Sequence, residues 1–147
     1  MRIAKNLLAL TAVVVLGLSA CSSAKQSAGN PDITDIYWRL TELKGVPVPV
    51  ATAGKKEVFI RLLKQGNRLE GFGGCNGFGG SFVMEDGGKI SFSQIMGTMM
   101  ACGDLEHENK LLDALRSTDN YIHTGKQLIL NEGKKSPLAR FEAIYYK

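Results

Sequence analysis

Sulfur-bearing side chains are the groups in this sequence whose types and spacing could do chemistry. Cys75 and Cys102 bracket a stretch that also contains Met96, Met99 and Met100. Two cysteines outside the cytoplasm usually pair. A disulfide that closes a loop as long as the one from Cys75 to Cys102 stabilises a domain by about 3–4 kcal/mol. Thiolates and thioethers are also the ligands that Cu(I) prefers, although methionine more commonly fills gaps in a core. The sequence predicts a disulfide, with a copper or redox site as the alternative.

The other reactive residue types form no recognisable catalytic pattern. His107 and His123 lie far apart without metal-ligand spacing, and no serine stands in a nucleophile elbow. The glycine-rich stretch 71–80 lacks the Gly-Lys-Ser/Thr of a phosphate-binding loop and precedes a strand instead of a helix. Within it, Asn76 is expected to hydrogen-bond to local backbone groups. We therefore expect no enzyme activity, no catalytic residues, no cofactor and no resident metal.

The charge balance argues against a nucleic-acid partner. The 147 residues include 18 basic and 14 acidic side chains, a formal charge of +4, which falls to about +2 without Arg2 and Lys5. Nucleic-acid binding requires a concentrated basic face, which a nearly balanced chain does not provide. A chain of this length, 44% hydrophobic, fits one globular domain. We expect that domain to be a monomer.

The N-terminal segment predicts export. Arg2 and Lys5 precede an apolar run over residues 7–18. The run is shorter than the roughly 20 residues of a membrane-spanning helix but has the length of a secretory signal core. Residues 1–20 are therefore predicted to be a signal peptide.

A lipid anchor is predicted at the end of this signal. Leu18-Ser19-Ala20-Cys21 resembles a bacterial lipobox, which implies cleavage before Cys21 and acylation of that residue. Several acyl chains together hold a protein on a bilayer. Ser22, in place of aspartate, favours the outer membrane over the inner membrane. Residues 21–34 are predicted to be the lipidated cysteine and a flexible tether, which leaves the protein facing the periplasm.

A series of β-strands and one helix must position the sulfur-bearing residues. Alternating apolar residues predict a first strand with Trp38 as a core anchor, and prolines make residues 45–50 a loop or a sheet edge. Phe141, Ala143 and Tyr145 are expected on one face of the last strand. The predicted strands are residues 36–40, 57–63, 68–72, 81–84, 89–92, 120–123, 127–130 and 138–146, with 95–100 extended.

The predicted helix covers residues 104–117. Asp104 is expected to cap it, with Glu106 and Glu108 near its start and Arg116 near its end, as the helix dipole favours. Its apolar stripe suits packing on a sheet. This stripe consists of Leu105, Leu111, Leu112 and Leu115. The chain is thus predicted to be an antiparallel α+β domain.

Together these pieces resemble the META domain, also called the HslJ-like family, over residues 35–147. The resemblance rests on the strand containing Trp38, on Gly74-Cys75-Asn76, on Ile90-Ser91-Phe92 and on the run Thr98-Met99-Met100-Ala101-Cys102. It implies an antiparallel, partly closed, barrel-like sheet with one α-helix packed on it. The positions that match the motif are Gly74, Cys75, Asn76, Thr98, Met100 and Cys102.

The resemblance also implies a role. Members of this family are bacterial envelope proteins, often lipidated, and one is linked to heat induction and novobiocin tolerance. No catalytic residues are known for the family, so none are transferred to this chain. We expect a non-enzymatic envelope lipoprotein that binds another envelope protein or an apolar ligand and contributes to stress tolerance.

Overall fold

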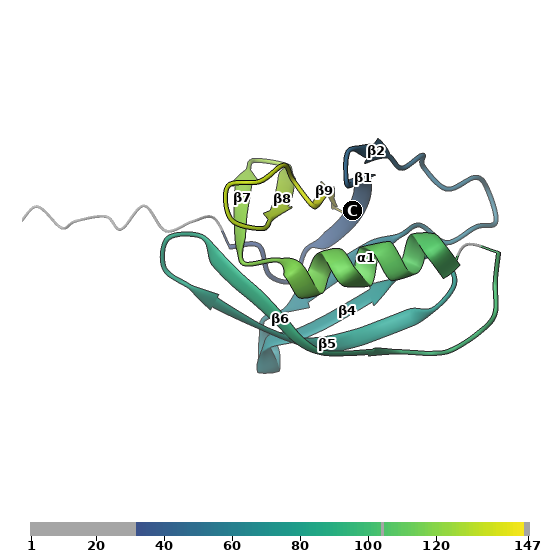
Figure 1. Cartoon of the computed structure of the whole chain (residues 1–147), viewed down its shortest axis with the longest axis horizontal. Helices are drawn as coiled ribbons and strands as arrows, with labels where there is room; N and C mark the ends of the chain where they lie inside the picture. The colour runs from purple at the N-terminus through teal and green to yellow at the C-terminus, as the bar shows by residue number, and fades with distance from the viewer. Residues whose placement is uncertain (1–31, 104, 146–147) are drawn as a thin grey trace, which may run out of the picture.

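The computed structural model describes residues 32–103 and 105–145 (Figure 1). The predicted signal peptide, the predicted lipidation site Cys21, most of the predicted tether and the predicted helix cap Asp104 lie outside the described residues. Within the described part, the helix is neither long nor apolar enough to cross a membrane.

In this described part the chain forms nine β-strands and one α-helix. The order along the chain is strands, the helix, then three more strands, as the sequence predicts. The elements are β1 Tyr37–Leu43, β2 Val46–Pro47, β3 Phe59–Leu63, β4 Arg68–Phe72, β5 Gly77–Glu85, β6 Lys89–Gly97, α1 Leu105–Ser117, β7 Asn120–Thr124, β8 Gln127–Asn131 and β9 Ala139–Ile144, with a short 3-10 turn at Gln65–Asn67.

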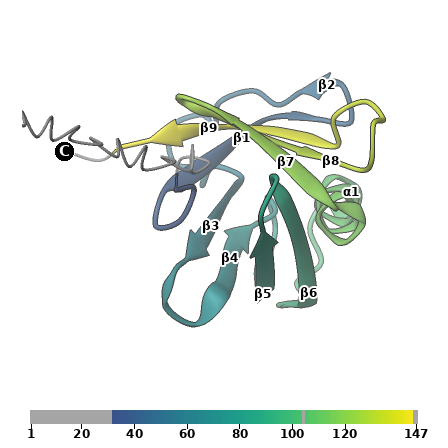
Figure 2. The ribbon, with the colours of Figure 1, turned by 90° about the vertical axis from the view of Figure 1, so that its left-hand side faces the viewer.

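The sheet closes on itself into a ring-like arrangement. Neighbouring strands pair antiparallel from β3 through β9, and β9 pairs back onto β1, whose other edge carries β2 and β3. Between β6 and β7 the pairing is reduced to Lys89 opposite Asn120. Helix α1 packs against β6, on the side where β6 and β7 diverge (Figure 2). The predicted antiparallel α+β fold with one helix is confirmed.

The core lies inside this ring and under the helix. Trp38, the predicted anchor, is fully buried, and its indole N–H donates a hydrogen bond to the Ile33 carbonyl at 2.9 Å. Alternation along each strand supplies the inward side chains, as period-two patterning requires. The largest of these are Ile60, Leu62, Leu69, Phe82, Ile90, Leu128, Leu130 and Phe141, together with Leu111 and Leu115 from α1.

Strand β5 begins earlier than predicted, within the glycine-rich stretch. The prediction started this strand at Ser81, whereas it starts at Gly77. A Cβ atom on Gly80 would lie 2.8 Å from the Ser93 carbonyl oxygen on β6, so glycine permits the close approach of the two strands. Residues 77–80, which the prediction left outside any strand, therefore belong to the sheet.

A β-bulge in β6 changes which side chains face inward. The pairing of β5 with β6 shifts between Gly79 and Ser81, and Gln94 on β6 has φ +52°. Before the bulge the even-numbered Ile90 and Phe92 are buried. After the bulge Met96 is 77% exposed, because a bulge moves the following side chains to the opposite face. Beyond Gly97 the predicted extended segment is a loop.

The end of the last strand also differs from the prediction. Phe141 and Ala143 are buried as expected, but β9 ends at Ile144, and Tyr145 is 61% exposed. The expectation that Tyr145 shares their buried face is wrong, because the alternation of a strand does not continue beyond its last paired residue.

Candidate functional site

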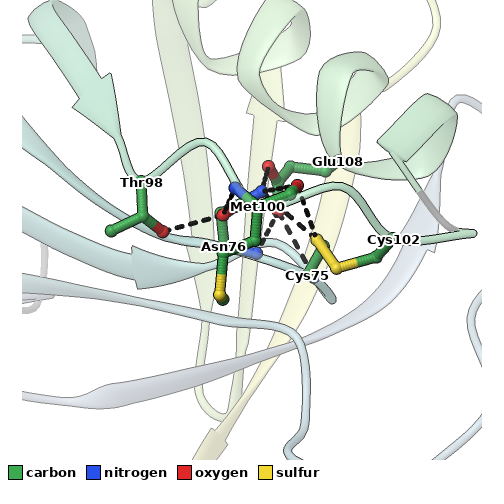
Figure 3. Close-up of a disulfide and its surroundings, with 6 residues drawn as sticks. All are labelled: Cys75, Asn76, Thr98, Met100, Cys102 and Glu108. Atoms are coloured by element: carbon green, nitrogen blue, oxygen red, sulfur yellow. Dashed lines mark hydrogen bonds between the residues drawn. A yellow bond between two sulfur atoms is a disulfide. The ribbon is translucent and has the colours of Figure 1, made fainter.

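Cys75 and Cys102 are joined by a disulfide, with their Cα atoms 5.9 Å apart (Figure 3). It connects the turn between β4 and β5 to the loop that precedes α1. A disulfide sulfur is not a thiolate and is a poor metal ligand. A copper site would therefore have to rely on methionine thioethers alone, and nothing in the structure favours this alternative.

Asn76 is the centre of the hydrogen bonds around this disulfide. Its side chain is buried, and its Oδ1 accepts hydrogen bonds from the Thr98 hydroxyl and the Met100 backbone N–H, both at 2.8 Å. Its Nδ2 donates to the Met100 carbonyl at 3.2 Å. The prediction that this side chain bonds to local backbone is wrong, since its backbone partner Met100 lies 24 residues away and its one local contact is with the Cys75 sulfur.

Glu108 completes the arrangement from the first turns of α1 (Figure 3). Its side chain is 4% exposed, and Oε2 accepts hydrogen bonds from the backbone N–H groups of Asn76 at 2.6 Å and Cys75 at 3.3 Å. Oε1 accepts from Asn76 Nδ2 at 2.9 Å. No ion pair within residues 32–103 and 105–145 involves this carboxylate, so backbone and amide donors stabilise it.

From the sequence, Glu108 is expected only to interact favourably with the helix dipole, and its hydrogen bonds to the turn are not predicted. A signal was available, because Glu108 lies three residues after Leu105 and three before Leu111, on the apolar face of α1. A carboxylate on that face is expected to be buried and to need hydrogen-bond donors.

Two glycines allow this carboxylate to approach the turn. A Cβ atom on Gly73 would lie 2.5 Å from Cγ of Glu108, and Gly74 has φ +112°, a conformation that other residues rarely adopt. The Gly73 N–H also donates to the Asn76 carbonyl at 2.9 Å. We call Cys75, Asn76, Thr98, Met100, Cys102 and Glu108 the Asn76 cluster.

The Asn76 cluster joins most residues of the predicted motif into one structural unit. Gly74 contributes its backbone conformation, and the side chain of Met100 does not take part, because Met100 is held through its backbone. The side chains of Thr98, Asn76 and Glu108 form a chain of hydrogen bonds with Asn76 in the middle. Such an arrangement holds three segments of chain together and leaves no obvious unpaired base to activate a nucleophile.

The two histidines lie elsewhere. His123 Nε2 is 2.8 Å from the Gly125 carbonyl oxygen, and its ring packs edge-to-face on Trp38 with centroids 5.5 Å apart. His107 is half-buried in the first turn of α1. Groups of three or more histidine, cysteine or acidic residues that could hold a metal ion do not occur in the described part of the chain.

An apolar groove of about 660 Å³ adjoins the Asn76 cluster, between α1 and the loop that follows β6. The three methionines on its wall are exposed by 77% at Met96, 98% at Met99 and 57% at Met100, so they do not fill the core, a point that the sequence alone left open. Leu105 and Leu112 of α1 form the opposite wall. We call this hollow the methionine groove.

Comparison with known proteins relates the chain to one family and one fold. The sequence model of the META domain matches residues 31–145. An NMR structure of a protein from Burkholderia xenovorans has 28% sequence identity and a TM-score of 0.58, over 78% of this chain and 85% of that chain. A second NMR structure, with 21% identity and a TM-score of 0.59 over 75% and 90% of the two chains, shares the fold. No curated protein sequence gives a match.

Proposed function

Because this chain belongs to the META domain family, we propose that it is a non-enzymatic lipoprotein of the bacterial envelope. In this proposal it supports tolerance of heat and of antibiotics such as novobiocin by binding an apolar ligand or an apolar segment of an envelope protein. The observation that carries the binding role is the methionine groove, which exposes three unbranched apolar side chains next to a rigid cluster. Flexible thioether side chains adapt to apolar partners of different shapes.

The Asn76 cluster supports binding in preference to catalysis. Its carboxylate and its amide are already engaged with one another and with backbone groups. An enzyme would need such groups to be available to a substrate. The cluster instead fixes one wall of the methionine groove, because Met100 is held at both its N–H and its carbonyl.

The described chain begins near the end of the β5–β6 pair that lies opposite the methionine groove. Asp32 and Ile33, at the start of the described chain, line a hollow together with Met84, near the turn between β5 and β6. Met84 pairs with Ile90, and Met96 lies six residues further along β6, roughly 20 Å away at 3.3 Å per residue. Figure 1 shows these two ends of the β5–β6 pair on opposite sides of the molecule. In this proposal the flexible tether after Cys21 joins the domain far from the groove and leaves the groove open to a partner in the periplasm.

Complementation of a deletion strain tests the binding role. Wild-type protein is expected to restore survival after heat and novobiocin, whereas Met99→Asp is expected to fail because it places a charge in the groove. The matched control is Val83→Asp on β5, which is 53% exposed and lies outside the groove, and it should restore survival. A deletion without a phenotype, or full rescue by Met99→Asp, would contradict the proposal.

Labelling with palmitate tests the anchor. The wild-type chain should incorporate the label and sediment with outer membranes, and Cys21→Ser should do neither. Incorporation of label into the Cys21→Ser variant would rule out this attachment site.

A further inference from the structure

We propose that Met96, Met99 and Met100 form a site of oxidative modification, at which peroxide converts exposed thioethers to sulfoxides and makes the methionine groove polar. The consequence for binding rests on the proposed function of the groove. The modification itself does not, because it depends only on where reduced sulfur is exposed.

The first observation is the distribution of sulfur. The two cysteines of the described chain are already oxidised to a disulfide, so they are closed to the oxidation steps of a free thiol. The reduced sulfur atoms within residues 32–103 and 105–145 are therefore four thioethers. Three of them lie within five residues of one another on the groove, and the fourth, Met84, lies near the other end of the β5–β6 pair.

The second observation is that the backbone turns these side chains outward. The bulge at Gln94 places Met96 on the solvent side of β6, although regular alternation from Ile90 and Phe92 would place it inside. Met99 lies in the loop between β6 and the disulfide, and its side chain is 98% exposed. Apolar side chains are not normally presented to water in such a group, which marks the surface as functional.

The third observation is that oxidation would leave the scaffold intact. Met100 is fixed through its backbone, whose N–H donates to Asn76 Oδ1 at 2.8 Å and whose carbonyl accepts from Asn76 Nδ2 at 3.2 Å. The thioether takes no part in these bonds. An oxygen atom added to an exposed sulfur therefore changes the polarity of the groove without breaking the Asn76 cluster.

The chemical step is a two-electron oxygen transfer. A lone pair of the methionine sulfur attacks one oxygen of hydrogen peroxide, the O–O bond breaks, and the departing hydroxide takes the remaining proton to leave as water. Sulfur is oxidised to the sulfoxide and peroxide is reduced. The product is polar where the thioether was apolar, and methionine sulfoxide reductases can reverse the change.

Peptide mass mapping tests the modification site. The full chain is treated with increasing hydrogen peroxide, and the single oxygen added to each methionine is quantified with time. The exposures predict oxidation of Met99 first, then Met96, then Met100, and Met84, at 37% exposure, last. Oxidation of Met84 as fast as the other three would overturn the proposal.

Binding of the apolar fluorescent probe N-phenylnaphthylamine tests the consequence. Untreated wild-type protein should bind the probe, peroxide should abolish binding, and a methionine sulfoxide reductase should restore it. The triple variant Met96→Leu/Met99→Leu/Met100→Leu keeps the groove apolar and should bind the probe before and after peroxide. Met99→Leu alone should lose only part of its probe binding after peroxide. Because this side chain makes almost no packing contacts, the single variant should fold normally and serves as a check if the triple variant misfolds.

The outcomes separate the two proposals. Equal loss of probe binding in wild type and triple variant would overturn the link between these methionines and the groove. If wild-type protein still bound the probe after complete oxidation, the claim that sulfoxides make the methionine groove polar would be overturned. Absence of probe binding before peroxide would contradict the apolar-ligand form of the proposed function and this consequence with it, whereas the mass map would still decide the modification site.

Discussion

The two sides of the segment from Met96 to Cys102 differ in how they are bonded and exposed. On the inner side Thr98 and the backbone of Met100 hydrogen-bond to the buried Asn76, and Cys102 is joined to the buried Cys75. On the outer side the side chains of Met96, Met99 and Met100 are exposed and make none of those bonds. One short segment is thus scaffold on one side and, in the proposed function, the binding surface on the other. Substitutions on the inner side should therefore change stability, and those on the outer side should change binding alone.

The largest effect is expected for Glu108→Ala. It leaves the backbone N–H groups of Cys75 and Asn76 without an acceptor and removes one acceptor of Asn76 Nδ2, which should lower the free energy of unfolding by about 4 kcal/mol. Urea unfolding monitored by Trp38 fluorescence measures the change. The control Glu106→Ala removes an 82% exposed side chain from the same turn and should leave the stability nearly unchanged. Similar losses of stability for the two variants would contradict the role of the buried carboxylate in holding the inner side.

Loss of the disulfide should have the next largest effect. The double variant Cys75→Ala/Cys102→Ala releases two residues 27 apart in sequence and should lower stability by about 3–4 kcal/mol. Wild-type protein unfolded in the presence of reductant should give the same midpoint as the variant. A reductant that leaves the midpoint unchanged would show that hydrogen bonds alone hold the cluster.

Gly73→Ala should cost about 2 kcal/mol, because its added Cβ would crowd Cγ of Glu108 at 2.5 Å. Gly103→Ala is the matched control. A Cβ there would have no atom within 4 Å, and the change should be close to neutral. Thermal melts of the two variants provide the measurement, and equal melting temperatures would contradict the close approach of the carboxylate.

An exposed carboxylate should matter less than the buried one. The pKa of Asp32 is lowered to about 2, chiefly by the hydrogen bond from the Thr34 hydroxyl, then by the Thr34 backbone N–H and by Lys64. A lowered pKa stabilises the fold above the unfolded value, near 4, and the gain is lost as pH falls toward 2.

Because the Asp32 side chain is 54% exposed, its contribution should stay below about 1 kcal/mol. Asp32→Asn should therefore lower the free energy of unfolding slightly at pH 7. Between about pH 4 and pH 2 the free energy of unfolding of this variant should fall less steeply than that of the wild type. Urea unfolding across this pH range compares the two proteins. Identical pH profiles would show that the Thr34 contacts do not hold the charged form.

The smallest effect on stability is expected on the outer side. Met99→Ser should change the free energy of unfolding by less than about 0.5 kcal/mol, since the side chain is 98% exposed, yet it should weaken binding of the apolar probe. Paired urea and fluorescence titrations measure both quantities on one sample. A stability loss as large as that of Gly73→Ala would remove the distinction between the two sides.

The order of elements and most of the core were predictable because they follow local rules. Alternation identified the buried face of Trp38, and the leucine stripe located α1. These patterns depend on residues a few positions apart, which the sequence displays directly.

What sequence reasoning missed depends on contacts between distant segments. The burial of Glu108 requires the turn at residues 73–76 to supply its donors, and the outward position of Met96 requires a bulge that only the pairing with β5 defines. The pairing of Cys75 with Cys102 could be inferred because few cysteines are available, whereas the partners of Asn76 could not.

Closure of the ring has a consequence for the synthesis of this chain. Strand β1 pairs with β9 through contacts such as Trp38 opposite Ala143, so the earliest and latest strands of the domain must meet. A nascent or truncated chain lacking β9 leaves the backbone edges of β1 and β8 open, and such edges promote aggregation. Folding is therefore completed only after the carboxyl-terminal strand has been synthesised and has closed the ring.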